Sequence, residues 1–373
     1  MFNDNNIIVD AVGHAYDFTP GNRVESCPLA VYDGVAAYTH AEVHAVAESL
    51  KPGYQLSYAE YVAPWPADEV ADVFFAESDV DAFAYHGVRL PPVSRNGISP
   101  FDLGVELKRA HPDRVFLYAP VDALGGAGEL EEMERMASEA KIDGFKFYPS
   151  NGLVDPNLHQ AVTISFSDLD SVGPYLEKAR ELGVRHIAVH KAIPIGPGPL
   201  APNRPDDIGV AATAFPDLTF EVVHSGWAFL EDCALQMVTH PNIYANLECV
   251  ANFLVRRPTR FAHVLGTLRH YAGDDRLLFG TGAMACHPAP VVAALAAFEM
   301  PQELVDGEGY RPVDDDVKAK ILGGNYLRLH GIDPAAMAQR LKDDPVVRRD
   351  LDADGLPLTP WRLHRERSAV LAA

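Results

Sequence analysis

Histidine and glutamate side chains end several short apolar runs of this sequence. "RHIAVH" ends at His190, "LTFEVVH" at His224 and "NIYANLE" at Glu248, while His14 ends the first such run and His287 follows the last. Imidazole and carboxylate are the groups with which proteins bind zinc, iron, manganese and nickel. A single histidine at a strand end more often packs with a hydrogen bond than binds a metal. The joint occurrence nevertheless predicts a metal site, provided that these strand ends meet.

The apolar runs alternate with segments of helical length. Eight runs are rich in β-branched or aromatic residues, and they span 6–14, 81–88, 114–123, 142–150, 185–194, 218–226, 242–250 and 276–283. Amphipathic stretches such as "VGPYLEKARELG" lie between them, and this one ends in the glycine typical of a helix C-terminus. Strands that alternate with helices predict parallel βαβ units, and eight units close into a (β/α)8 barrel, the α/β TIM-barrel fold.

The barrel predicts where the chemistry lies, because active sites of such barrels form where the strands end. The ends of the second, third and fourth runs add His86, Asp122 and Lys146 to the residues named above. Lys146 has an alternative role, since its aliphatic stem can simply cover the barrel rim. No G-x-S-x-G turn and no locally activated cysteine is present, so the sequence does not favour a covalent nucleophile.

The chain is expected to form one metal-dependent barrel over residues 1–332. A long insertion at about 17–76 follows the first strand and should lie near the barrel mouth. The Pro- and Gly-rich stretch 193–209 should lie over the same face. Residues 333–373 are expected to be a C-terminal helical extension and tail.

Composition restricts the partners and the compartment. The net charge of −21 and the pI near 5.0 argue against nucleic acid and against an anionic membrane, because both require a basic face. Four scattered cysteines without a CxxC pair fit a reducing compartment. The N-terminal "MFNDNNIIVD" lacks the pattern of a signal peptide, and no apolar stretch is long enough to span a membrane. We therefore expect a cytoplasmic protein.

Motifs spread over residues 7–332 resemble the amidohydrolase superfamily, in particular its decarboxylase-like, amidohydrolase-2 branch. The resemblance rests on "IIVDAVGHAYDF", "GFKFYP", "AVHKAIP", "FEVVHSGWAFL", "LLFGTGA" and "VKAKILGGNYLRLHG". In that family an H-x-H pair on strand one and an Asp on strand eight hold a metal. Here His14 matches the second histidine, but Val12 and Gly282 stand at the positions of the other two ligands. Lys146 falls where some members carry a bridging carboxylated lysine.

The altered pattern is similar to a subgroup of amidohydrolase-fold nonheme diiron monooxygenases that includes platensimycin- and platencin-type diterpenoid hydroxylases. The similarity rests on "NLE", the "GTG…HP" loop and "HKAIPIGP". It implies two iron ions held by relocated ligands and hydroxylation of an unactivated C–H bond with O2. The ligands expected for this site are His14, Glu60, His190, His224, Glu248 and His287, with Glu248 and Lys146 as catalytic residues.

Two alternatives remain open at this stage. One is a mononuclear hydrolase or nonoxidative decarboxylase that uses one zinc or manganese ion, and the other is a degenerate barrel that binds without chemistry. The resemblance further implies a large, lipophilic, diterpenoid-like small-molecule substrate linked to CoA as an acyl thioester, and an external electron donor besides O2. A CoA group would meet some of five basic residues, namely Arg95, Lys191, Arg204, Arg256 and Arg257. A homo-oligomer is possible.

Overall fold

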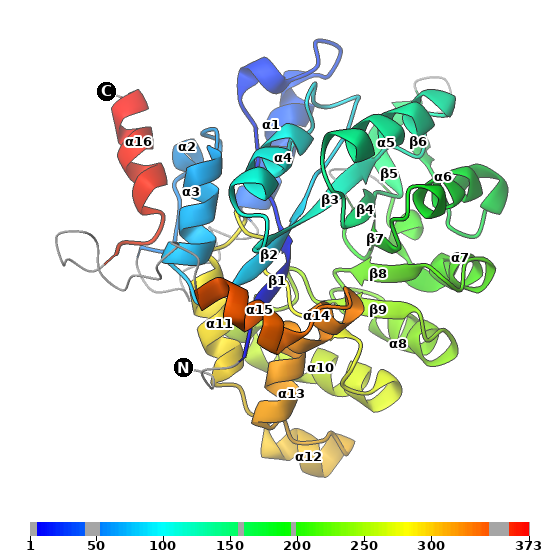
Figure 1. Cartoon of the computed structure of the whole chain (residues 1–373), viewed down its shortest axis with the longest axis vertical. Helices are drawn as coiled ribbons and strands as arrows, with labels where there is room; N and C mark the ends of the chain where they lie inside the picture. The colour runs from blue at the N-terminus through cyan, green and yellow to red at the C-terminus, as the bar shows by residue number, and fades with distance from the viewer. Residues whose placement is uncertain (1–5, 42–52, 156–159, 195–198, 343–357, 373) are drawn as a thin grey trace.

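Eight parallel strands form the centre of the molecule in the computed structural model, which describes residues 6–41, 53–155, 160–194, 199–342 and 358–372 (Figure 1). Their order in the sheet is their order in the chain. The strands are β1 (Val9–Gly13), β2 (Ala82–His86), β3 (Val115–Val121), β4 (Gly144–Phe147), β7 (His186–His190), β8 (Thr219–Val223), β9 (Ile243–Asn246) and β10 (Leu277–Leu278). All eight predicted runs contain one of these strands.

The sheet closes between its first strand and the segment that follows its last. The amide of Ala11 donates to the carbonyl of Phe279 at 2.7 Å, and the amide of Gly282 donates to the carbonyl of Val12 at 3.0 Å. A parallel bridge between Gly13 and Ala283 continues this pairing. The predicted (β/α)8 TIM barrel of amidohydrolase type is therefore confirmed.

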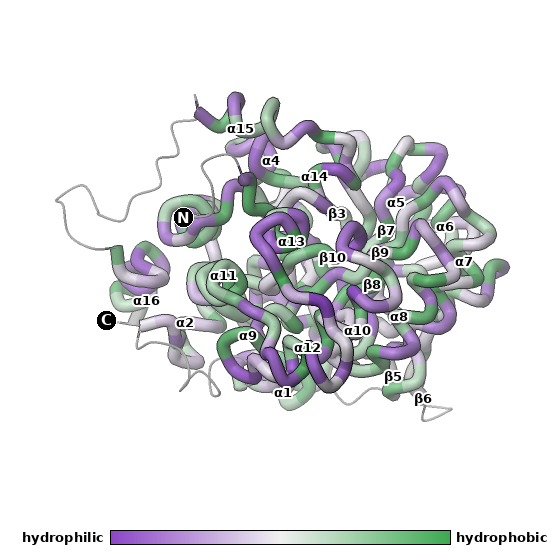
Figure 2. The backbone as a smooth tube through the Cα atoms, turned by 90° about the horizontal axis from the view of Figure 1, so that it is seen from below, coloured by the Kyte–Doolittle hydropathy of each residue, from purple (hydrophilic) through white to green (hydrophobic). Residues whose placement is uncertain are grey.

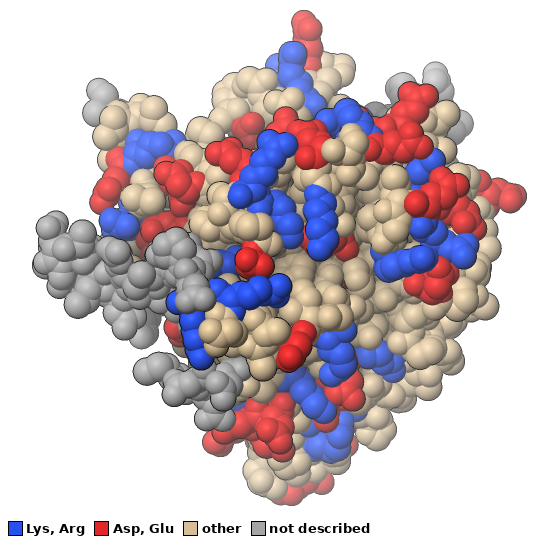
Figure 3. Space-filling model, viewed as in Figure 1, with Lys and Arg blue, Asp and Glu red and all other residues tan. Residues whose placement is uncertain are grey.

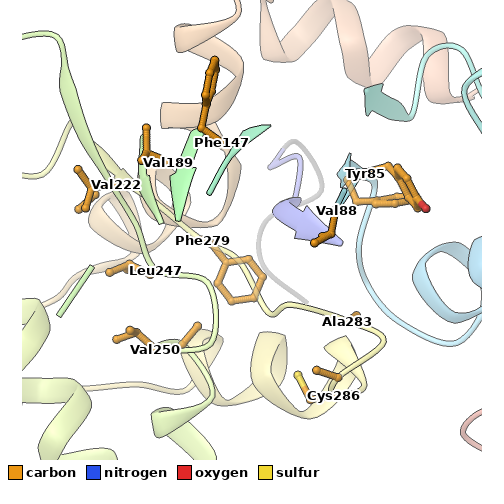
Figure 4. Packing of buried hydrophobic residues seen from close by; sticks show 14 of the residues in the cluster. Tyr85, Val88, Phe147, Val189, Val222, Leu247, Val250, Phe279, Ala283 and Cys286 are labelled. Carbon is orange, nitrogen blue, oxygen red and sulfur yellow. The ribbon is translucent and has the colours of Figure 1, made fainter. Parts of the chain in front are cut away.

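Alternate side chains of each strand pack outward against the helices. Phe147, Val189 and Val222 stand at matching register positions of β4, β7 and β8, and all three belong to the main buried apolar cluster (Figure 4). Because successive strand residues point to opposite faces, the next position along each strand faces the barrel interior. This alternation turns Lys146 and His190 inward.

Helices surround the barrel between the strands. The bounds of the main ones are α4 (Phe101–Ala110), α5 (Ala127–Glu139), α6 (Leu169–Glu181), α7 (Ile208–Ala214), α8 (Leu230–Thr239), α9 (Phe253–Arg256), α10 (Pro258–Ala272) and α11 (Pro288–Ala296). The side chain of Asp168 caps α6 by accepting from the Ser171 amide at 3.3 Å. Gly183 follows that helix with a φ of +74°, a conformation that glycine adopts without steric cost. A two-stranded antiparallel hairpin, β5 (Ser150–Asp155) with β6 (Gln160–Thr163), was not predicted and follows β4.

The segment between β1 and β2 contains the predicted insertion. It comprises the short helix η1 (Pro20–Asn22), α1 (Leu29–His40), α2 (Tyr58–Tyr61), α3 (Ala67–Ala71) and a π-helical turn, η4 (Asp72–Ala76). Residues 42–52 of this segment lie outside the described part of the chain, as do 195–198 of the Pro-rich loop. That loop contains two short helices, η5 (Ala201–Asn203) and η6 (Pro205–Asp207).

The helices after α11 close the end of the barrel opposite to the carboxyl ends of the strands. They are α12 (Gln302–Glu308), α13 (Asp315–Ala319), η7 (Lys320–Gly324), α14 (Asn325–Leu329) and α15 (Pro334–Lys342). A second buried apolar cluster fills the barrel at this closed end, and it includes Tyr326, Leu327 and Met337 of these helices. The segment around α13 is hydrophilic (Figure 2), and the face in Figure 3 shows acidic and basic side chains interspersed. Among the described residues, no helix is long and apolar enough to cross a membrane.

The last helix, α16 (Arg362–Ala372), lies beside α2 and α3 (Figure 1). His364 is buried and stacks on Trp65, with 3.5 Å between the ring centroids. Its Nδ1 lies 2.7 Å from a carboxylate oxygen of Glu69, so the buried ring has a polar partner. His330 lies at the opposite end of the barrel from the strand ends, 3.2 Å from the hydroxyl of Tyr118. Residues 343–357 of the predicted tail lie outside the described part of the chain.

Candidate metal-binding site

Five of the predicted site residues meet at the carboxyl ends of the strands. His14 follows β1, Lys146 lies on β4, His190 ends β7, and His224 and Glu248 come one and two residues after β8 and β9. All five are buried, from 0 to 6% exposed. The residues at 192, 224 and 249 have positive φ angles between 60° and 66°, so the chain turns sharply as it leaves three neighbouring strands. Such uncommon backbone conformations concentrate at functional sites.

The imidazole of His14 presents one nitrogen to Glu248. Its Nδ1 lies 2.8 Å from the backbone carbonyl oxygen of His86, which can only accept a hydrogen bond. Nδ1 therefore carries the proton in the neutral ring, and Nε2 keeps its lone pair. That Nε2 lies 4.0 Å from Oε1 of Glu248. A backbone carbonyl that fixes the tautomer in this way is a usual support for a metal-binding histidine.

Hydrogen bonds also fix the state of His224. The Nε2 of His190 contacts the carbonyl of Ile193, so His190 Nδ1 must accept a hydrogen bond, and it does so from His224 Nε2 at 3.0 Å. In the neutral ring, Nδ1 of His224 then has a lone pair, yet it lies 2.8 Å from Oε2 of Glu248 and 3.3 Å from the backbone carbonyl oxygen of the same residue. Two acceptors at this distance repel each other unless a cation lies between them or the ring is protonated. These donors therefore fit a bound metal ion.

The protonation states also suit metal binding. Burial lowers the pKa of His14 to about 4, with a further decrease from the charge of Lys146, against the opposing effect of Glu248. Burial would raise the pKa of Glu248, but His224, His14 and Lys146 outweigh it and hold this pKa below its usual range. At neutral pH, His14 is thus neutral and Glu248 ionised, and metal ligands must be in these forms.

The position of Glu248 explains the glycine on the eighth strand. A Cβ atom at position 282 would lie 2.4 Å from Oε1 of Glu248 and 3.2 Å from Sγ of Cys249. The Glu248 carboxylate therefore occupies the space into which any side chain at position 282 would project. Gly282 has a φ of +71° and accommodates this approach. The carboxylate beside Gly282 is therefore that of Glu248, which follows β9, the strand before β10.

Val12 is buried and belongs to the apolar cluster that fills the closed end of the barrel, so it provides no ligand. Asp10, two residues earlier, accepts hydrogen bonds from the amide and hydroxyl of Thr281 at 3.0 and 2.5 Å. This carboxylate joins β1 to the segment after β10 and is fully engaged there. The first strand thus contributes one candidate ligand, His14.

The structure does not bring Glu60 or His287 to this group. Glu60 forms a capping box at the start of α2, where one of its carboxylate oxygens accepts from the Ser57 amide at 2.7 Å. His287 caps α11 through Nδ1, and its Nε2 lies 3.1 Å from Oε2 of Glu77. Both residues therefore have local structural partners. The Ser57–Glu60 pair is a capping box, whose S-x-x-E pattern is present in the sequence but was not used. The partner of His287 lies 210 residues away in the chain, so the sequence does not reveal it.

Lys146 lies under the candidate ligands. It is fully buried, and its Nζ has no hydrogen-bond partner among the described residues, although it stands 5.3 Å from the centre of the Tyr148 ring. Burial lowers its pKa to about 8, against the opposing charges of Glu248, Glu221 and Cys249. A buried ammonium group without a hydrogen-bond partner is costly, so this charge balances anionic groups in the site.

A cavity of about 120 Å³ opens above these residues. Its walls come from α1, from α9 and from the loops after β1, β2, β4, β7, β8, β9 and β10. Most lining side chains are apolar or aromatic, namely Tyr16, Val35, Tyr38, Val88, Ile98, Tyr148, Ile193, Pro194, Trp227 and Ala285, while Thr39, Asn252 and Arg256 are polar. This composition matches a site for a small organic molecule with an apolar body.

The basic residues predicted to meet a CoA phosphate are differently placed. Lys191 is fully buried, 2.7 Å from Oδ1 of Asp207, and Arg204 lies 2.6 Å from Oδ1 of Asp232. Arg95 donates to the backbone carbonyl of Arg23 at 3.1 Å. Arg256 lines the cavity, whereas its neighbour Arg257 is exposed at the start of α10.

Cys249 is a residue that sequence reasoning missed, because no cysteine shows local activation in the sequence. It lines the cavity, and its Sγ lies 3.2 Å from Oε1 of Glu248. His224, Glu248 and Cys249 each offer a ligand atom, and these atoms lie within 4.8 Å of one another. The only sequence signal is its position directly after Glu248.

Solved structures share this fold at low sequence identity. An uncharacterised TIM-barrel protein from Bordetella bronchiseptica superposes with a TM-score of 0.59 at 16% identity, over 89% of this chain and 99% of that one. A 2,6-dihydroxybenzoate decarboxylase from Rhizobium gives 0.56 at 12% identity, over 87% and 99%. A 5-carboxyvanillate decarboxylase from Novosphingobium aromaticivorans, complexed with manganese, gives 0.50 at 12% identity, over 89% and 98%.

Comparison of the sequence with a family model identifies the family, whereas comparison with individual curated proteins does not. No curated protein matches the chain significantly. The model of the family described as Amidohydrolase, however, matches residues 14–332, which contain seven of the eight barrel strands and every residue of the candidate site. The chain belongs to this amidohydrolase family.

Proposed function

We propose that this protein is a metal-dependent nonoxidative decarboxylase that acts on a small carboxylic acid with a largely apolar, ring-like body. The observation that carries the proposal is that His14, His224 and Glu248 are buried together at the base of an apolar, aromatic-lined cavity. The similar fold of two decarboxylases, one with manganese bound, supports the reaction class.

One divalent ion would be held by His14, His224 and the Glu248 carboxylate, since both imidazoles present a nitrogen to this carboxylate. This is a three-ligand set of imidazole and carboxylate, typical of catalytic sites that keep an open position. Bound there, the ion would supply Lewis-acid chemistry toward a substrate carboxylate. His190 would hold the tautomer of His224 through the 3.0 Å hydrogen bond rather than bind the ion itself.

The remaining residues would bind the substrate and exclude water. Tyr16, Tyr148 and Trp227 line the cavity and present aromatic surface to an apolar ring. A substrate that fills this cavity displaces water, and the lower dielectric strengthens its interaction with the site charges. The Lys146 ammonium adds a positive charge below the site, which offsets the anionic substrate. Arg256 gives the cavity wall a second cationic point.

Glu248 provides the direct test. Glu248→Gln keeps the shape of the side chain but removes its charge, so metal affinity should fall at least about tenfold and decarboxylation of aromatic carboxylates by about 100-fold. Elemental analysis and release of CO2 measure the two effects. Asp170→Asn, on the exposed side of α6, is the matched control and should change neither. Normal metal content and full activity in Glu248→Gln would refute the proposed site.

A diiron monooxygenase remains the second candidate, as the sequence resemblance implies. The observation in its favour is that His14, His190, His224, Glu248 and Cys249 together exceed the needs of one ion. Anaerobic loading with Fe(II) distinguishes the two candidates. Two irons per chain and consumption of O2 with an acyl-CoA substrate would favour hydroxylation. One ion per chain and CO2 release without O2 consumption would favour the decarboxylase.

A further inference from the structure

Cys249 differs from the other three cysteines in its surroundings. The sulfur atoms of Cys27, Cys233 and Cys286 contact Pro28, Ser225 and Thr281, and none of these cysteines lines the cavity. The Cys249 sulfur instead faces the cavity beside a carboxylate oxygen of Glu248. The structure therefore places one thiol of this chain among the candidate metal ligands.

The space for this sulfur exists because position 282 is glycine. A Cβ atom there would approach Sγ of Cys249 to 3.2 Å and Oε1 of Glu248 to 2.4 Å. Glu248 and Cys249 thus share the volume that a longer side chain at 282 would need. Consecutive residues of a strand normally point to opposite faces, but the φ of +60° at Cys249 turns its sulfur to the same side as the Glu248 carboxylate.

The charge of the site gives a second, independent observation. Lys146 is 0% exposed, and its Nζ has no hydrogen-bond partner in the described part of the chain. A divalent ion with one carboxylate and one thiolate ligand is neutral overall. Lys146 would then leave one positive charge, which matches a substrate carboxylate.

We propose that Sγ of Cys249 binds the same ion as His14, His224 and Glu248, and that it shifts the metal preference of this site from manganese toward zinc, cobalt or iron. Thiolate sulfur favours these softer ions, whereas carboxylate and water suit manganese. Four protein ligands still admit the substrate as a fifth, since catalytic zinc sites expand to five-coordination. This inference rests on the metal site of the proposed function and adds a ligand to it.

Cobalt(II) gives a readout that does not depend on activity. The full-length protein is treated with chelator and reloaded with Co(II), and sulfur-to-cobalt charge transfer is recorded in the near ultraviolet. Wild type and Cys286→Ser, the matched control, should show the band, and Cys249→Ser should lack it. In competition dialysis with Zn(II) and Mn(II), Cys249→Ser should lose zinc selectivity by about tenfold or more.

A second variant guards against misfolding. Cys249→Gly suits the positive φ at this position and should fold at least as well as wild type by circular dichroism, while it also lacks the band. If wild type binds Co(II) without a sulfur band, Cys249 is not a ligand, although the proposed metal enzyme stands. If wild type binds none of the three ions, both the inference and the proposed function are wrong.

Discussion

At the scale of single residues, the site depends on two neighbouring strand ends, one of which leaves space that a side chain from the other fills. Gly282 offers no ligand, but its missing side chain leaves room for the carboxylate of Glu248, which lies where a Cβ at 282 would stand. The carbonyls of His86 and Ile193 accept hydrogen bonds from His14 and His190. These bonds, with the one between His190 and His224, determine which ring nitrogens keep lone pairs. Backbone carbonyl groups therefore decide which nitrogen atoms of these histidines are free to bind a metal.

Because Glu248 occupies this space, even one methyl group at position 282 should weaken metal binding. In Gly282→Ala the new Cβ would lie 2.4 Å from Oε1 of Glu248 and would also adopt a positive φ, so we expect about 1–3 kcal/mol of strain and displacement of the carboxylate. Metal affinity, measured by titration calorimetry, should fall at least about tenfold. Gly128→Ala is the control, because a Cβ there meets no atom within 4 Å. Equal metal affinity in the two variants would contradict this account.

At the scale of elements, a buried carboxylate joins the C-terminal helix to the segment after β1. Glu77 accepts from the amides of Trp361 and Arg362 at 2.7 and 2.8 Å, and it also contacts Nε2 of His287 at 3.1 Å. Three separate parts of the chain thus depend on one side chain. This contact explains why His287 is engaged here instead of at the metal site.

Removing this carboxylate should loosen α16. Glu77→Ala leaves the two backbone amides and the His287 ring without their acceptor, so the free energy of unfolding should fall by about 1–3 kcal/mol and α16 should exchange its amide hydrogens faster. Hydrogen exchange read by mass spectrometry checks this locally. The control Glu303→Ala removes an exposed carboxylate on α12 and should leave α16 protected. Unchanged exchange of α16 in Glu77→Ala would show that other contacts hold the helix.

At the scale of the whole molecule, one end of the barrel carries the candidate metal site and the other end is closed by the C-terminal helices. The closed end contains His186 and His330, whose ring centroids are 4.1 Å apart, together with Tyr118 and Tyr326. Burial lowers the pKa of His186 to about 4 and that of His330 well below its ordinary value. Both rings are therefore neutral in the folded protein at neutral pH.

These two histidines predict a loss of stability in acid. Their pKa values are lower in the folded than in the unfolded chain, so the unfolded state takes up protons first as the pH falls. The stability is complete above about pH 6.5 and declines between about 6.5 and 4, by at most about 3 kcal/mol for His186. Urea unfolding of metal-free protein at several pH values measures this decline. His186→Gln should reduce the slope, and an unchanged slope would exclude this residue as a source.

The sequence by itself determined the fold and most of the site. The alternation of apolar runs and amphipathic stretches specifies βαβ units, and eight of them leave a closed barrel as the compact arrangement. Residues at the ends of parallel strands must meet at one edge, so His14, Lys146, His190, His224 and Glu248 were predictable. This inference needs only the period of a strand and the direction of its neighbours.

Only the tertiary structure decided what each side chain contacts. His287 has suitable chemistry and a plausible position, but Glu77, 210 positions away in the chain, binds it. Cys249 follows Glu248, and strand alternation would point it away from the site. A positive φ, and a glycine 33 residues later that leaves the space, bring its sulfur beside the Glu248 carboxylate. Such contacts depend on backbone angles and distant neighbours, which residue types and spacing do not specify.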